Sequence, residues 1–132
     1  TLPASYRVTA TIPHATRNND YFGIVLKWGS GTGIKIFQEY AGTVRIGPAD
    51  SAGGNVTVTV PGGVPASWNT DQDHTISGSY DSTTGRATIY LDNAEYGYGT
   101  IETNRYTVGT AVGFCGESQQ KYWRSIVVEE LP

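Results

Sequence analysis

The 132-residue chain has few charged residues, a single cysteine and no long apolar run. Only 16% of its residues are charged, and its nine Lys and Arg residues are scattered beside 12 Asp and Glu, for a formal net charge of -3. Phosphate backbones are bound by basic stripes that neutralise several charges together, so we expect no nucleic-acid partner. No apolar stretch is long enough to cross a bilayer, so we expect no membrane insertion.

Cys115 is the only cysteine, which excludes an internal disulfide and leaves the redox compartment open. A catalytic thiol would need His14 or His74 brought to it from a distant segment, whereas a small buried thiol needs nothing further. We therefore interpret Cys115, in the apolar segment VGFCG, as a core residue. One cysteine and two separated histidines also cannot make a zinc site.

The sequence also lacks a pattern that pairs carboxylates on one face. Glu129 and Glu130 are neighbours and so point to opposite faces of a strand. Glu39 and Glu95 each lie beside a tyrosine, but nothing in the sequence brings them together. Glycoside hydrolysis needs two carboxylates facing each other, about 5 Å or more apart. We therefore expect a protein that is not an enzyme.

Glycine and aromatic residues are abundant, at 17 residues and 11% of the chain. Short apolar or alternating segments bounded by turn residues recur along the sequence, and no stretch has a 3.6-residue period. We expect about ten strands, with a hairpin around DSTTG and a meander over 21–47, in which YFGIVLKW is a central strand covered on both faces. The segments are 6–12, 21–28, 33–40, 43–47, 55–60, 74–80, 86–92, 96–101, 105–109, 111–116 and 122–131.

So many strands in one core cannot form a single flat sheet, which leaves two antiparallel sheets packed face to face or a closed barrel. We predict the first, an all-β, two-sheet antiparallel β-sandwich. No repeat or linker interrupts the chain, so residues 1–132 are expected to form a single domain. The chain opens on Thr1, not Met, and we expect a module processed or excised from a longer parent.

Three parts of the sequence resemble the concanavalin A-like lectin/glucanase superfamily, in particular jelly rolls of the laminin-G and pentraxin kind. They are Trp68, the segment HTISGSYDSTTGRATIYLDN (74–93) and the C-terminal segments VGFCG and YWRSIVVEEL. In that superfamily a tryptophan precedes a strand ending in Tyr-Asp, a short turn with glycine follows, and the next strand closes on Tyr-apolar-Asp-Gly. Asp92-Asn93 replaces that last Asp-Gly here, and still tolerates a left-handed backbone.

The resemblance covers about half of the chain and implies a jelly-roll β-sandwich. Its members mostly bind sugars or protein partners, some through calcium, and a subset cleaves polysaccharides. Fold alone does not choose among these functions. The catalytic members carry a Glu-x-Asp-x-x-Glu strand or two glutamates on facing strands, and neither pattern occurs in this sequence.

Aromatic residues at turns, or out of phase with their apolar neighbours, are the candidate site. Sugar rings stack their C–H faces on aromatic planes while their hydroxyls bond to planar polar groups. Tyr96 and Tyr98 are in phase in EYGYGT and are expected side by side, and Tyr90 is out of phase with the apolar residues around it. The expected carbohydrate-binding residues are Trp28, Gln38, Glu39, Tyr40, Arg45, Tyr96, Tyr98, Asn104 and Trp123. The aromatics expected in the core are Tyr6, Phe22, Phe37, Trp68 and Phe114.

We therefore expect a non-catalytic carbohydrate-binding module or lectin-like domain that binds a polysaccharide or glycan. We expect it to be extracellular or secreted, and a catalytic or adhesin domain could be fused to it. The alternative is a structural or adhesive protein-interaction domain, such as a laminin-G-like repeat or a viral fibre or capsid component. No cofactor is expected. Calcium is left open, because 18–20, or Asp71 and Asp73, carry hard oxygen ligands, although Asn and Asp in turns mostly bond their own backbone.

Overall fold

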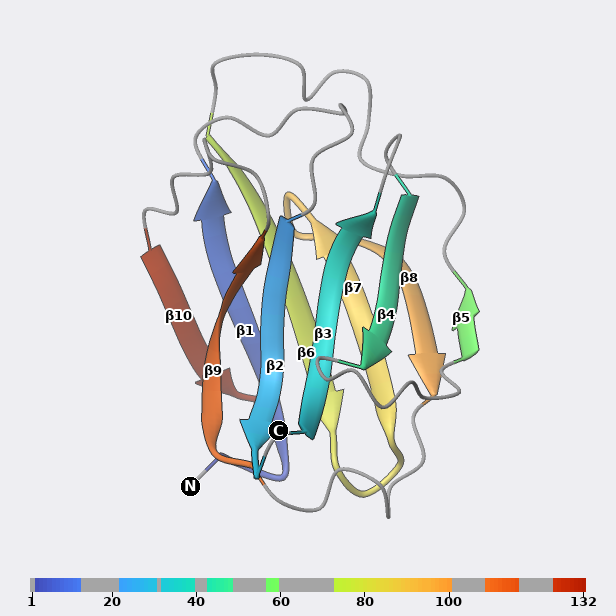
Figure 1. Cartoon of the computed structure of the whole chain (residues 1–132), viewed down its shortest axis with the longest axis vertical. Helices are drawn as coiled ribbons and strands as arrows, with labels where there is room; N and C mark the ends of the chain where they lie inside the picture. Colours follow the sequence, from blue (N-terminus) through green and yellow to red (C-terminus); the bar gives the residue numbers. More distant parts are fainter. Residues whose placement is uncertain are drawn as a thin grey trace.

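The computed structural model describes residues 2–12, 22–30, 32–39, 43–48, 57–59, 73–100, 109–116 and 125–132, although some side chains at strand ends are left out of that description. These residues form ten strands and no helix. The strands form two layers that lie face to face (Figure 1). This confirms the predicted all-β, two-sheet antiparallel β-sandwich.

Each layer is an antiparallel sheet with its own strand order. The first sheet has the order β10-β1-β6-β7-β8-β5 and the second the order β4-β3-β2-β9. The first sheet comprises β10 (Ser125–Glu130), β1 (Ser5–Ile12), β6 (His74–Asp81), β7 (Arg86–Leu91), β8 (Ala94–Thr100) and β5 (Thr57–Thr59). The second comprises β4 (Thr43–Pro48), β3 (Thr32–Glu39), β2 (Phe22–Gly29) and β9 (Ala111–Gly116). The predicted meander is confirmed as β2, β3 and β4.

The core lies between the sheets and is built by period-two alternation along the strands. Gly78 in β6 shows how closely the sheets approach, because a Cβ atom there would lie 2.4 Å from Ile36 Cδ1 and 2.6 Å from Leu26 Cδ2. The buried apolar residues are Tyr6, Val8, Ala10, Ile24, Leu26, Ile34, Ile36, Ile46, Ile76, Tyr80, Ala87, Ile89 and Leu91. The prediction of a core Tyr6 is confirmed.

Two tight turns join β6, β7 and β8. At the first, the Gly85 amide donates to the Asp81 carbonyl at 2.8 Å, and the Asp81 carboxylate accepts the Thr83 amide at 2.8 Å. At the second, Asp92 and Asn93 both have left-handed backbones, with φ of 50° and 66°. Two successive left-handed residues match the twist of a two-residue hairpin, so Asp92 and Asn93 form the tight turn that was expected of an Asp-Gly pair.

The expectation that YFGIVLKW is covered on both faces is wrong. The β2–β3 register shifts between Val25 and Lys27, so that Lys27 lies opposite the buried Ile34 and points into the sandwich. Trp28, the next residue, is 38% exposed. The bulge therefore buries Leu26 and Lys27 in succession, while Val25 and Trp28 are only partly covered.

Phe114, expected in the core, is 40% exposed in β9, an edge strand of the four-stranded sheet. An edge strand is flanked by only one neighbour, and this leaves part of the ring accessible. Phe22, Phe37 and Cys115 lie in strands, but their side chains are outside the described set. Residues 13–21, which include His14 and the residues 18–20, lie outside it too, as do Trp68 and Asp71.

Candidate functional site

The outer face of the six-stranded sheet, which points away from the four-stranded sheet, is polar and carries two tyrosines. Alternation turns its side chains outward from four adjacent strands while their neighbours fill the core. Hydroxyl-bearing side chains predominate between the charged ones. The outward residues are Arg7 and Thr9 on β1, Ser77 and Ser79 on β6, Arg86, Thr88 and Tyr90 on β7, and Glu95 and Tyr98 on β8.

Arg7 reaches from β1 across β6 to cover Tyr90 on β7. Its guanidinium carbon lies 4.1 Å from the centre of the Tyr90 ring, a cation–π distance. Its Nη2 donates to Ser77 Oγ at 3.3 Å and to Asn93 Oδ1 at 3.1 Å. Arg7 thereby ties three strands and the β7–β8 turn together, and it fixes the position of the Tyr90 ring.

Arg86 makes a second stack of the same kind on the neighbouring strand pair. Its guanidinium carbon lies 4.1 Å from the centre of the Tyr98 ring, and its Nη2 lies 3.9 Å from Glu95 Oε1. Tyr98 is 39% exposed, and both side chains of the Arg86–Glu95 pair are exposed. A guanidinium stacked on a ring still has N–H groups at its edge that can bond a ligand.

The two stacks lie side by side because of the β7–β8 register. Thr88 lies opposite Tyr98, and Tyr90, two residues further along β7, lies opposite Glu95. Tyr90 and Tyr98 are therefore diagonal neighbours, with Cβ atoms within about 8 Å of each other. We call Arg7, Tyr90, Arg86, Glu95 and Tyr98 the tyrosine face. It combines aromatic rings, guanidinium donors and a carboxylate acceptor on one surface, where Arg86, Glu95 and Tyr98 are exposed and Arg7 and Tyr90 are half-buried.

Tyr96 does not stand beside Tyr98, which corrects the sequence-based expectation. The β7–β8 register passes from Ile89 opposite Gly97 to Tyr90 opposite Glu95, so Tyr96 is the extra residue of a bulge. Tyr96 is half-buried and packs against the core, whereas Tyr98 points outward. Strict alternation would have placed both rings on one face, and the bulge separates them.

Of the other expected site residues, Trp28 has a described side chain, and it does not join Tyr98. Trp28 lies near the end of β2 on the outer side of the four-stranded sheet, beside Gly33, so the whole sandwich separates it from Tyr98. Three more positions lie in that second sheet, with side chains outside the described set: Gln38 and Glu39 in β3 and Arg45 in β4. Tyr40, Asn104 and Trp123 lie outside the described residues.

Within the tyrosine face, Tyr98 alone was predicted as a site residue from the sequence. Arg7, Tyr90, Arg86 and Glu95 were not. The signal available was phase, because Arg7 and Arg86 alternate with core residues and so had to point outward. Which ring each arginine covers depends on strand order. Arg7 and Tyr90 are brought together by an antiparallel β1–β6–β7 arrangement that no local pattern encodes.

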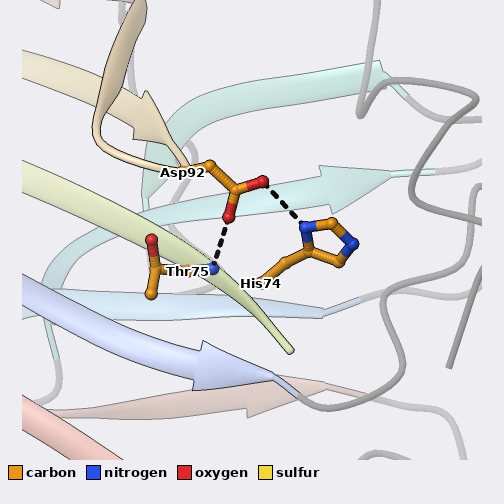
Figure 2. Close-up of polar contacts among 3 residues, drawn as sticks. All are labelled: His74, Thr75 and Asp92. Carbon is orange, nitrogen blue, oxygen red and sulfur yellow. Dashed lines mark hydrogen bonds and ion pairs between the residues drawn. The ribbon is translucent and has the colours of Figure 1, made fainter. Parts of the chain in front are cut away.

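A second polar group joins His74 and Asp92 at the end of the β6–β7 pair where β6 begins and β7 ends (Figure 2). Asp92 Oδ2 lies 2.7 Å from His74 Nδ1, and Oδ1 accepts the Thr75 amide at 2.9 Å. The Asp92 amide in turn donates to the Thr75 carbonyl at 2.9 Å. A carboxylate placed on Nδ1 sets the orientation of the imidazole, and here the pair also anchors the β7–β8 turn to the start of β6.

Three ionisable side chains lie inside the sandwich. Tyr6 donates its hydroxyl to the Leu26 carbonyl and meets Tyr80 edge to face, with ring centres 6.2 Å apart. Lys27 Nζ lies 5.6 Å from the centre of the Tyr80 ring. Burial raises the pKa of both tyrosines and lowers the pKa of Lys27, because the charged form of each group loses its hydration.

No three His, Cys, Asp or Glu side chains gather as metal ligands in the part of the chain that the structure describes. Asp73, one of the residues considered for calcium, is exposed just before β6. None of the described residues forms a helix that is long and apolar enough to span a membrane.

No protein-family model matches the chain, and no curated protein matches it. Among solved structures it is similar to a native heptameric SAP-like pentraxin from Limulus polyphemus, with 16% sequence identity and a TM-score of 0.36. The match covers 100% of this chain and 68% of the pentraxin chain. At this level the likeness carries no argument about function.

Proposed function

We propose that this domain binds carbohydrate without catalysis, as a lectin-like or carbohydrate-binding module, and that the tyrosine face is its binding surface. One observation carries the proposal: Tyr98 is exposed and lies in a row of polar side chains beside a second arginine–tyrosine stack. A sugar ring needs an apolar plane and oriented polar groups at the same place, and this surface has both.

Each residue of the tyrosine face has a definite role in this proposal. The exposed part of the Tyr98 ring stacks on the C–H face of a sugar. Arg86 donates from the edge of its guanidinium, and Glu95 accepts from sugar hydroxyls. Tyr90, held by Arg7, meets a neighbouring sugar unit. The bound molecule is an extended polysaccharide lying across strands β7 and β8.

The proposal involves no reaction and no cofactor, and it places the domain outside the cell. Stacking and hydrogen bonds to neutral hydroxyls need no metal, so binding is expected to be the same with EDTA as with added calcium. If binding requires calcium, the site includes ligands beyond the tyrosine face.

The test is a binding screen against soluble and insoluble polysaccharides with two matched variants. Tyr98→Ala and Trp28→Ala each remove one aromatic ring of nearly equal exposure, 39% and 38%, from opposite faces of the sandwich. We expect Tyr98→Ala to weaken binding about tenfold, the equivalent of roughly 1.4 kcal/mol, and Trp28→Ala to leave it unchanged. Circular dichroism checks that both variants fold. Equal loss in both variants, or loss only with Trp28→Ala, would refute the assignment.

One observation favours the alternative of a protein-interaction domain. Val127 and Val128 are 56% and 41% exposed at the centre of the edge strand β10, where the backbone of an edge strand can pair with a strand of another protein. A domain with that function alone would bind none of the polysaccharides, and Tyr98→Ala would have no effect on its partner.

A further inference from the structure

The strand β10 is an exposed, apolar edge. It pairs with β1 on one side, from Thr11 opposite Ser125 to Tyr6 opposite Glu130, and it is the last strand of the described sheet on the other (Figure 1). Its backbone N–H and C=O groups on that free side are a template for another strand. Val127 and Val128 at its centre are 56% and 41% exposed.

The opposite edge of the same sheet is built differently. There β5 has three residues, Thr57–Thr59, whereas β10 has six. Natural sheets limit unwanted pairing with short edge strands, or with charges and proline in the middle of the edge. The charges of β10, Glu129 and Glu130, come only at its end, so the centre of the strand lacks this protection.

The side chains of β10 suit pairing with a second copy of the same strand. Val127 lies opposite Thr9 and points outward, whereas Val128 lies opposite the buried Val8 and points inward with Ile126. In an antiparallel pair, residues directly opposite each other share a face. A symmetric pair in one continuous sheet must therefore be centred on a residue and not between two residues.

Centring the pair on Val127 gives the favourable register. Val127 then faces the partner's Val127, Ile126 faces the partner's Val128, and Ser125 faces the partner's Glu129. No glutamate faces its own copy or an apolar side chain. Centring on Val128 instead would set Glu129 against the partner's Val127 and Glu130 against the partner's Ile126, where the carboxylates lose hydration without a partner.

We propose that two copies of this chain associate through β10, antiparallel, with a two-fold axis at Val127. The two six-stranded sheets then form one continuous sheet. An isologous contact of this kind closes after two subunits, so the product is a dimer and not a filament.

The dimer has a consequence for binding that rests on the proposed function. The two-fold axis runs perpendicular to the sheet at β10, so both tyrosine faces lie on the same side of the continuous sheet. From β8 of one copy to β8 of the other there are nine strand spacings, or about 43 Å at roughly 4.8 Å each. Two sites on one side can hold one polymer, and such bivalence strengthens binding without new contacts.

The first experiment measures mass and cross-linking with no glycan present, so its result is independent of the proposed function. Light scattering across a concentration series should show the mass rise from 14.2 kDa towards twice that value. Val127→Cys in a Cys115→Ser background should form a disulfide dimer on mild oxidation, because directly opposite Cα atoms lie within disulfide range.

The matched control is Ile126→Cys in the same background. In the proposed register the two introduced thiols of this variant are offset by two residues, beyond the roughly 7 Å limit between Cα atoms, so cross-linking should be at least tenfold slower. Val127→Lys, which sets two ammonium groups face to face, should be monomeric with an unchanged circular dichroism spectrum. A monomer mass at every concentration, or equal cross-linking at positions 126 and 127, would overturn the proposal.

Discussion

The interior and the outer face of this sandwich use the same pairing of a cation with a tyrosine, in opposite surroundings. Outside, Arg7 and Arg86 each lie 4.1 Å from a ring centre and also have polar partners. Inside, Lys27 lies 5.6 Å from the Tyr80 ring centre and is only 9% exposed. The Arg86–Tyr98 stack is exposed and available to a ligand, whereas burial lowers the pKa of Lys27, because its charged amine has lost part of its hydration inside the sandwich.

The largest change in the free energy of unfolding is expected when a buried tyrosine is replaced by alanine, in contrast to an exposed one. Tyr80→Ala should lower the free energy of unfolding by about 3–5 kcal/mol, because it leaves a cavity between the sheets. Tyr98→Ala should change that free energy by no more than about 0.5 kcal/mol, because its ring is at the surface. Urea unfolding followed by circular dichroism measures both. Similar losses of stability in the two variants would contradict the contrast between the buried Tyr80 and the exposed Tyr98.

The next largest change is a gain in stability from removing the charged amine of Lys27, a side chain that points into the sandwich. Lys27→Met should raise the free energy of unfolding at neutral pH by about 1–2 kcal/mol, because a thioether of similar length needs no hydration. Lys35→Met is the control, since Lys35 lies opposite Val25 on the outward side of the same strand pair, and it should change stability by about 0.5 kcal/mol or less.

The pH dependence of that gain tests its cause. Burial lowers the pKa of Lys27 below its ordinary value of 10.5, so between the two values the unfolded chain binds more protons and stability rises with pH. The advantage of Lys27→Met should therefore be largest below the native pKa and shrink as the pH rises towards 10.5. An advantage that does not vary with pH would assign the gain to packing alone.

A smaller difference is expected between two buried hydroxyls. The Tyr6 hydroxyl donates to the Leu26 carbonyl, whereas the Tyr80 hydroxyl is buried with no hydrogen-bond partner among the described residues. Tyr6→Phe should cost about 1 kcal/mol, and Tyr80→Phe should be neutral or stabilising, because it removes a polar group that folding leaves unbonded. Thermal unfolding of the two variants distinguishes them, and a larger loss for Tyr80→Phe would contradict this account.

The smallest change in stability is expected at the exposed turn between β6 and β7. The Asp81 carboxylate accepts the Thr83 amide, which lowers the pKa of Asp81 below its usual 3.8. The native pKa is the lower one, so this contribution is present above pH 3.8 and is lost as the pH falls through the native value. Asp81→Asn should therefore flatten the acid side of the stability curve. An unchanged curve would show that the turn does not depend on this carboxylate.

Alternation predicted much of the fold from the sequence. The phase of Tyr90 in β7, the hairpin between β6 and β7 and the left-handed pair at Asp92 follow from side-chain period and turn chemistry, and the structure confirms them. The bulges at Leu26 and Tyr96 could not be predicted, since a bulge is set by how a strand meets its neighbours. Each bulge reverses the face of the residues beyond it, which turns Lys27 inward and separates Tyr96 from Tyr98.

The candidate site could also be predicted only in part from the sequence. The outward phase of Arg86 and Tyr90 is visible in RATIYLD, but the contact of Arg7 with Tyr90 depends on which strands are neighbours in the sheet. Propensity and phase act within one strand, whereas sheet order is decided by the packing of the whole core. The sequence therefore predicted outward-facing aromatic and polar side chains, and the structure shows which of them are neighbours.

The measurement that tests the central claim most directly is amide chemical-shift mapping by NMR, during titration with a polysaccharide taken from the binding screen. Shifts are expected at Arg86, Thr88, Tyr90 and Tyr98, on the outer side of the six-stranded sheet, with little change at Trp28 and Lys35 on the opposite layer. Shifts centred on Trp28 and Lys35, with Tyr90 and Tyr98 unmoved, would place the ligand on the other sheet and contradict the account.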